Sequence, residues 1–331
     1  FLNWRIDFHK LFLMRRIEIP SAELQVSSYC LGTMYFGSKV PVDTSLTLLD
    51  AYADRGGNFL DSANKYASWI EGFSGGESER VIGRWLKDRP RDRFVVTSKV
   101  GFPYGDVPRS LRADVIVSEC EKSLRRLGTD YIDIYFAHAE DAGTPVEETL
   151  RAFDKLIRDG KVRCIGASNH QAWRLAEAEL MARAAGLPHY VVLQQRFSYL
   201  QPVVGADFGT QLPLTPEQTD FCARHGVLLM AYSPLLGGLY EKPEIPVPVQ
   251  YRSEHSDKLL ELLRRRAAEW GYTPSQLVLG WMLALSPCVV PEVTASRLEH
   301  LEANLREVDP AHAAVFAEEV ASVDSFTVKY S

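Results

Sequence analysis

Three consecutive apolar segments of the sequence each lead to polar residues whose side chains could act together on a carbonyl group. The first segment ends at Asp61 and is followed by Tyr66, the second ends at Lys99, and the third ends at His138. Short runs of β-branched and aromatic residues are typical of buried parallel strands, which usually lie beside their neighbours in the chain. We therefore expect these four side chains to meet at one edge of a sheet.

The four residue types suit the transfer of a proton to a reduced carbonyl oxygen. A tyrosine has a pKa of about 10, so it is a poor acid at neutral pH unless a nearby ammonium stabilises its phenolate. We predict that Tyr66 is the general acid, that Lys99 lowers its pKa and that Asp61 holds Lys99 in place. His138 would hydrogen-bond the substrate carbonyl and fix its angle. A single lysine or histidine at such a position is usually solvated or structural, and only the set favours catalysis.

Composition excludes several other classes of function. The 331 residues are 46% hydrophobic, which is enough for a large core. The net charge of −6 gives no reason to expect a nucleic-acid or anionic-membrane surface. No apolar stretch approaches the roughly 20 residues that span a bilayer. The five cysteines are widely spaced, so we expect reduced core thiols in a cytoplasmic protein and no metal site.

One domain is expected after a short leader. Residues 1–13 mix aromatic and charged side chains, which does not match a signal peptide, and Met14 resembles a native start. We interpret residues 1–13 as a leader or upstream extension and residues 14–331 as a single domain.

Strands and helices alternate along that domain. Strands are expected near residues 30, 59, 96, 134, 164, 192, 229 and 289. Apolar residues at helical spacing predict helices between them, over Thr44–Arg55, Glu77–Lys87, Ala113–Leu127, Val146–Asp159, Ala172–Ala185, Pro216–His225 and Pro274–Leu285. Eight such units predict an α/β fold of the closed (β/α)₈ barrel type, the TIM barrel. A doubly wound open sheet is the alternative, but the turn after the first strand lacks its Gly-x-Gly-x-x-Gly pattern.

Two connections are longer than a turn requires. They run from about Gln201 to Leu214 and from Gly237 to about Asp257. Long loops on the C-terminal face of a barrel are usually lids or ligand clamps, although plain surface elaboration is the alternative.

Several ordered motifs resemble the aldo-keto reductase family, from about Arg15 to Asp324. They are Phe59-Leu60-Asp61-Ser62-Ala63-x-x-Tyr66, Thr97-Ser98-Lys99, Asp130-Tyr131-Ile132-Asp133 with His138, and the run from Gly160 to Asn169. The resemblance implies a (β/α)₈ barrel that binds NADP(H) without a Rossmann domain, with Asp61, Tyr66, Lys99 and His138 as the catalytic residues.

The resemblance also implies a set of cofactor-binding residues. Ser168, Asn169 and Gln194 would bind the nicotinamide carboxamide, with Gln195 as a rival of Gln194, and the nicotinamide ring would stack on Tyr232. The remaining assignments are Gly32, Thr33 and Met34 after the first strand, Ser233, Leu235 and Gly237 along the pyrophosphate, and Ser296, Arg297, His300 and Asn304 at the adenine end.

The adenine end departs from the family pattern. Glu292 and Ala303 do not match it, and the segment between Pro291 and Asn304 is about two residues longer than usual. Arg297 and Ser296 could still bind a 2′-phosphate. We therefore expect NADPH as the cofactor, with NADH also usable.

The leading prediction is an NADPH-dependent reductase of an aldehyde or ketone, with sugars, sugar derivatives and aryl aldehydes as the substrates that fit. A redox-sensing regulatory subunit with the same barrel and cofactor is the first alternative, and an unrelated barrel lyase or isomerase is the second. A small carbonyl compound is the expected partner, and the oligomeric state stays open. The pocket is expected to be shaped by Met34, Tyr35, Trp69, Phe102, Tyr199 and the loop that begins at Gln201.

Overall fold

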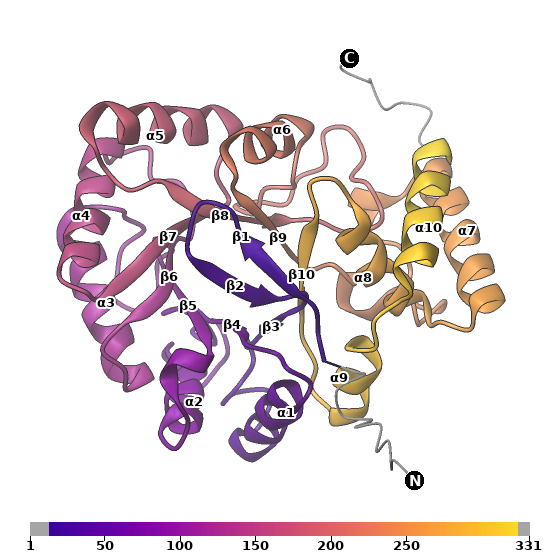
Figure 1. The fold of residues 1–331 in the computed structure, drawn as a ribbon, viewed down its shortest axis with the longest axis horizontal. Helices are drawn as coiled ribbons and strands as arrows, with labels where there is room; N and C mark the ends of the chain where they lie inside the picture. Colours follow the sequence, from indigo (N-terminus) through magenta and orange to yellow (C-terminus); the bar gives the residue numbers. More distant parts are fainter. Residues whose placement is uncertain (1–12, 324–331) are drawn as a thin grey trace, which may run out of the picture.

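The computed structural model describes residues 13–323, in which eight parallel strands close into a barrel (Figure 1). Their order around the barrel is β10-β3-β4-β5-β6-β7-β8-β9. Each predicted strand centre lies inside one of them, so the (β/α)₈ prediction is confirmed. The strands are β3 (Cys30–Gly32), β4 (Phe59–Asp61), β5 (Val95–Val100), β6 (Ile132–Ala137), β7 (Val162–Ser168), β8 (Tyr190–Arg196), β9 (Leu228–Tyr232) and β10 (Val289–Val293).

Helices surround the barrel and cover its outer face (Figure 1). All seven predicted helices are present, with ends within two residues of the prediction. They are α1 (Val42–Asp54), α2 (Glu77–Leu86), α3 (Ala113–Leu127), α4 (Val146–Arg158), α5 (Ala172–Ala185), α6 (Pro216–His225) and α8 (Pro274–Ala284). The described residues also form α7 (Glu254–Trp270), α9 (Leu298–Asn304) and α10 (Pro310–Val323).

Local chemistry explains where several helices begin and end. The Thr215 side chain caps α6 in a reciprocal pair with Gln218, and Pro216 occupies the first turn. Thr273 and Gln276 repeat that arrangement at α8. Gly226 ends α6 with a φ of 64°, a left-handed conformation that a side chain disfavours.

An antiparallel hairpin precedes the barrel and was not predicted. Its strands are β1 (Arg16–Ile19) and β2 (Leu24–Ser27), and they cross the barrel in the middle of the view (Figure 1). Ile19, Leu24 and Val26 are buried and belong to the same cluster as the apolar side chains inside the barrel. The hairpin therefore closes the end of the barrel where the parallel strands begin. The opposite end is the one that carries the C-terminal ends of the strands.

The two long connections lie where they were expected. The segment between β8 and α6 contains no helix, and the one after β9 holds the short 3₁₀ helices η3 (Leu236–Gly238) and η4 (Val249–Tyr251) before α7 begins at Glu254. The loops contact each other, because the Val203 amide donates to the Gln250 carbonyl at 2.8 Å. The predicted leader lies, except for Leu13, outside the described residues.

Candidate active site

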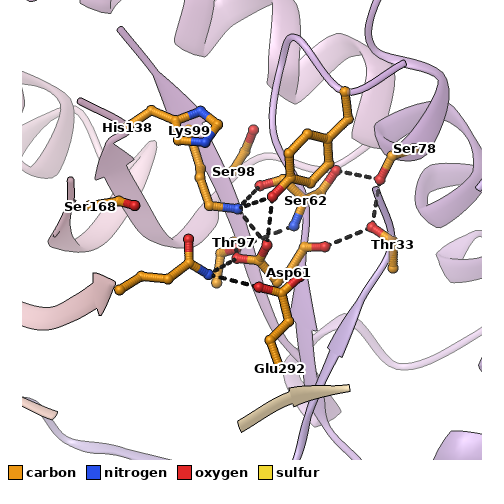
Figure 2. A network of polar contacts seen from close by, with 12 residues as sticks. Thr33, Asp61, Ser62, Ser78, Thr97, Ser98, Lys99, His138, Ser168 and Glu292 are labelled. Atoms are coloured by element: carbon orange, nitrogen blue, oxygen red, sulfur yellow. Dashed lines mark hydrogen bonds and ion pairs between the residues drawn. The ribbon is translucent and has the colours of Figure 1, made fainter. Parts of the chain in front are cut away.

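Asp61 and Lys99 form an ion pair at the C-terminal ends of β4 and β5, and both side chains are fully buried (Figure 2). Lys99 uses all three of its hydrogens: Nζ donates to Asp61, to the Ser62 carbonyl at 2.8 Å and to Tyr66 Oη at 2.8 Å. The Thr97 hydroxyl donates to the other oxygen of Asp61 at 2.8 Å. Burying two charged groups without these hydrogen-bond partners would cost roughly several kcal/mol of stability, so the partners hold the pair in one geometry.

Tyr66 lies against this pair and is 7% exposed. Its hydroxyl accepts from Lys99 and donates to Asp61 Oδ2 at 3.0 Å. The expected lowering of its pKa is not what the structure shows. Burial, followed by the charges of Asp61 and Glu292, raises the pKa of Tyr66 well above its usual value. The phenol therefore keeps its proton, and that proton points at Asp61 until the hydroxyl rotates towards another acceptor.

His138 follows β6, and its ring stands edge-on to Tyr66 with 6.1 Å between ring centroids. The imidazole also packs edge-on against Phe102 at 4.7 Å. Burial, and then the positive charges of Lys99 and Lys65, lower the pKa of His138 well below its usual value, so the ring is neutral at pH 7. Its Nδ1 is buried and has no hydrogen-bond partner among the described residues. All four predicted catalytic side chains are thus brought together.

Glu292, a residue that departs from the family pattern, lies inside the barrel beside this group (Figure 2). The Gln194 amide nitrogen donates to Glu292 Oε2 and to Asp61 Oδ1, both at 3.2 Å. Burial first, then repulsion from Asp61, raises the pKa of Glu292 to about 8, while Lys99 opposes that rise. Gly32 makes room for the carboxyl group, because a Cβ there would lie 2.1 Å from Glu292 Oε1.

Asn169 connects three strand ends near the mouth of the barrel. Its amide nitrogen donates to the His138 carbonyl at 2.9 Å and to the Ser168 hydroxyl at 3.1 Å. Its oxygen accepts from Tyr232 Oη at 2.8 Å and from the Leu212 amide at 3.1 Å. The side chain is therefore fully hydrogen-bonded, and a direct bond from Asn169 to a ligand amide has to replace one of these contacts.

The loop after β9 provides backbone groups suited to an anion. Ser233, Leu236, Gly237 and Gly238 all have positive φ, between 46° and 90°. Successive left-handed and right-handed residues turn neighbouring N–H groups towards one point, a common way to bind phosphate. A Cβ added at Gly237 or Gly238 would meet nothing within 4 Å, so the space above the loop is open. These features fit the pyrophosphate of a dinucleotide.

The comparisons with known proteins agree with this geometry. The statistical model of the aldo/keto reductase family matches residues 29–327. The chain belongs to the aldo-keto reductase family.

Relatives of this aldo-keto reductase include the norsolorinic acid reductase stcV of Emericella nidulans, which is 32% identical over 88% of this chain and 76% of its own length. The aryl-alcohol dehydrogenase GME11368 of Pestalotiopsis microspora is 29% identical over 88% of this chain and 77% of its own. A solved thermostable aldo-keto reductase, Tm1743, in complex with the inhibitor epalrestat, superposes with a TM-score of 0.70 at 27% identity over 92% of this chain and 99% of its own. The protein is accordingly an NAD(P)H-dependent oxidoreductase.

The adenine end of this aldo-keto reductase presents mostly exposed side chains. Ser296, Arg297 and His300 are exposed around the start of α9, and Asn304 is half-buried at its end. No described side chain forms an ion pair with Arg297. The guanidinium is therefore available to an incoming phosphate.

The other residues predicted to bind the cofactor or line the pocket differ in how deeply they are buried. The Thr33 hydroxyl donates to the Asp61 carbonyl at 2.6 Å, so it lies below the site surface. Met34 and Tyr35 are half-buried beside it. The side-chain oxygen of Gln195 accepts a hydrogen bond from the Asn169 backbone amide at 2.6 Å. Gln194 is therefore the glutamine that faces the barrel interior.

Tyr199 was expected in the pocket, and that expectation is wrong. It is 1% exposed and stacks on Phe316 of α10 with 5.6 Å between centroids. The aromatic run after β8 turns outward, so this residue packs between the barrel and the last helix.

Across residues 13–323, no three His, Cys, Asp or Glu side chains gather in a way that could hold a metal ion. None of the helices in this range combines the length and apolar character needed to cross a bilayer. The five cysteines all carry free thiols.

Proposed function

We propose that this aldo-keto reductase converts an aldehyde or ketone to the corresponding alcohol, with NADPH as the preferred cofactor. The observation that carries the proposal is the buried Lys99, which bonds Asp61 and Tyr66 Oη at the same time. The cofactor, when bound, supplies a hydride to the carbonyl carbon. The residues of this chain then account for the proton and for the position of the substrate.

Tyr66 donates the proton that completes the alcohol. As the carbonyl carbon gains the hydride, its oxygen becomes strongly basic and takes the phenol proton, and Tyr66 later regains a proton from solvent. The 2.8 Å contact from Lys99 Nζ stabilises the phenolate that forms, so Lys99 acts during the transfer although the pKa of resting Tyr66 is raised. Neutral His138 supplies a ring N–H to the carbonyl oxygen and fixes its direction.

Aryl carbonyl compounds fit the site better than sugars. Trp69 stands edge-on to Tyr66 at 6.4 Å, and Phe102 packs on His138 at 4.7 Å, so flat apolar surfaces flank the proton donor. The name of one relative, an aryl-alcohol dehydrogenase, is consistent with that choice.

Replacing Tyr66 tests the proton donor. We expect Tyr66→Phe to reduce benzaldehyde roughly 10²- to 10⁴-fold more slowly, because the phenol is the general acid. The dissociation constant of NADPH should stay close to the wild-type value, since within residues 13–323 the hydroxyl bonds only to Lys99 and Asp61. Steady-state rates and fluorescence titration measure the two quantities. A variant that keeps more than about a third of the wild-type rate would refute the assignment, and an inactive wild type that still binds NADPH would favour the regulatory alternative.

Arg297 tests the preference for NADPH. Charged hydrogen bonds contribute about 1.5–3 kcal/mol, so Arg297→Ala should weaken NADPH binding roughly 10- to 100-fold. NADH lacks the 2′-phosphate and serves as the internal control, because its affinity should scarcely change. Titration of both cofactors decides the point. Equal weakening would make Arg297 structural, and an unchanged NADPH affinity would place the phosphate elsewhere.

A further inference from the structure

Two cations flank the aromatic side chain that packs on His138. The ammonium of Lys65 lies 4.6 Å from the centre of the Phe102 ring, and the guanidinium of Arg109 lies 5.5 Å from it. The Lys65 ammonium also lies 5.7 Å from the centre of the Trp69 ring. The Phe102 ring in turn packs edge-on against His138, with 4.7 Å between the two ring centroids.

Neither cation has a carboxylate partner among the described residues. Lys65 forms no ion pair, and Arg109 donates only to the backbone carbonyl of Glu140, at 3.1 Å and 3.3 Å. Lys65 is half-buried, and burial followed by the charge of Arg109 lowers its pKa. The charge of Arg109 thus acts on Lys65 with no carboxylate to offset it, and a bound anion would relieve that repulsion.

The two cations follow other strands than the predicted phosphate-binding residues of the cofactor do. Lys65 follows β4, and Phe102 and Arg109 follow β5. The proposed pyrophosphate loop follows β9, and Arg297 follows β10, so β5 and β9 stand opposite each other in the closed barrel. The cations therefore face the substrate side of the catalytic group.

We infer that the substrate is an aryl aldehyde or ketone that carries a carboxylate, with its carbonyl at Tyr66 and His138 and its carboxylate between Lys65 and Arg109. This rests on the proposed reductase function and names the class of its substrate. Phe102 and Trp69 contact the ring of the substrate, and the two cations neutralise its charge. Lys65 and Arg109 are thus specificity-determining residues, separate from the groups that move the proton and the hydride.

A matched pair of aldehydes tests this assignment. 4-Carboxybenzaldehyde and methyl 4-formylbenzoate share the ring and the reacting carbonyl, and only the first is charged. With the wild type and NADPH, kcat/KM should be roughly 10- to 100-fold higher for the acid, because two charged contacts are made to the acid alone. Lys65→Met and Arg109→Met should each raise the KM for the acid much more than the KM for the ester, and so remove much of that preference. Added salt should also reduce the difference in kcat/KM between the acid and the ester, because salt screens the charged contacts.

Lys39→Met is the control variant, since the Lys39 ammonium also lies over an aromatic ring, that of Tyr35, at 5.0 Å. It should keep the wild-type ratio of acid to ester. The inference would be overturned if the wild-type kcat/KM values for acid and ester were about equal. It would also be overturned if Lys39→Met lowered the preference for the acid as much as Lys65→Met does. Lys65→Met and Arg109→Met variants that slow both aldehydes equally would overturn it as well.

Binding of the product separates this inference from the proposed reductase function. Calorimetry with 4-(hydroxymethyl)benzoate and with its methyl ester requires no turnover. Tighter binding of the acid that depends on Lys65 supports the substrate class even if neither aldehyde is reduced. Reduction of the ester with no preference for the acid in either assay would contradict the substrate class and leave the proposed reductase function intact.

Discussion

Gln194 joins two carboxyl groups that otherwise repel each other. Its amide nitrogen donates to Asp61 and to Glu292, each at 3.2 Å, and also lies 3.5 Å from Met230 Sδ. This fixes the plane of the amide, so its oxygen is the only atom left for a ligand such as a carboxamide. Asp61 in turn is bonded to Lys99 and Tyr66, so Glu292 lies within one chain of hydrogen bonds that ends at the predicted proton donor.

Glu292→Gln gives a prediction at the scale of a single residue. The raised pKa of about 8 means that the folded protein holds a proton which the unfolded chain releases near pH 4.5. The stability from this proton is fully present below the unfolded pKa and is lost as pH rises through the folded one. Glutamine cannot ionise, so the wild type should lose stability relative to Glu292→Gln between about pH 5.5 and about pH 8.5.

Urea unfolding of both proteins at the two pH values measures that difference. Glu18→Gln, at an exposed position of β1, is the matched control and should show no such change with pH. A constant difference between wild type and Glu292→Gln across the range would mean that Glu292 is ionised in the folded protein.

Among the elements, the two long loops are tied to the barrel by Arg196 at the end of β8. Its guanidinium donates to Gln211 at 2.6 Å and to the Tyr251 hydroxyl at 2.9 Å, and it also lies 4.8 Å from the centre of the Phe208 ring. One side chain therefore joins residues 201–214 to η4. The first of these loops contacts Asn169 through the Leu212 amide, and Asn169 also accepts from Tyr232, so the order of the loop affects the predicted nicotinamide site.

Arg196→Met should loosen these loops without unfolding the barrel. A typical hydrogen bond contributes about 0.5–1.5 kcal/mol, so losing the clamp should weaken NADPH binding by roughly 3- to 10-fold. Limited proteolysis within residues 201–214 should become faster, and fluorescence titration gives the cofactor affinity. Arg224→Met removes an exposed ion pair with Asp220 on α6 and is the control. Loops that resist protease as well as the wild type would show that Arg196 is dispensable for their order.

At the scale of the whole molecule, the hairpin closes one end of the barrel, and the candidate active site lies at the other. The hairpin buries Ile19 and Val26 completely against the apolar side chains inside the barrel. The ionisable groups gather at the other end, where the strands lead into loops. Stability and chemistry can therefore be altered separately in this architecture.

Ile19→Ala should lower the free energy of unfolding by roughly 2–5 kcal/mol, because it removes buried methyl groups and leaves a cavity. The kcat for benzaldehyde should be unchanged at temperatures where the variant is folded. Glu18→Ala, an exposed substitution on the same strand, should change stability by less than about 0.5 kcal/mol. Denaturant unfolding and steady-state assays check both points. A fall in kcat without a fall in stability would show that the hairpin influences the site.

The sequence by itself determined the eight strands and the seven helices between them, and it placed the four predicted catalytic side chains at the strand ends. It could do so because a buried parallel strand has a recognisable apolar run, and the residue that follows it must lie at the mouth of the barrel. Asp61, Lys99 and His138 are thereby placed by position alone. The same reasoning did not find β1 and β2, whose short strands resemble many surface segments, nor α7, which follows a long loop rather than a strand.

Only the tertiary structure decided what each side chain meets. Glu292 departs from a pattern in the sequence, but its contact with Gln194 depends on β8 and β10, which are distant in the chain. The pKa of Tyr66 is raised because folding buries the phenol and brings it near the charges of Asp61 and Glu292. Lys65 and Arg109 come from different loops and share one aromatic ring only after β4 and β5 pair. Local patterns specify elements, whereas burial and charge depend on neighbours that the fold brings together.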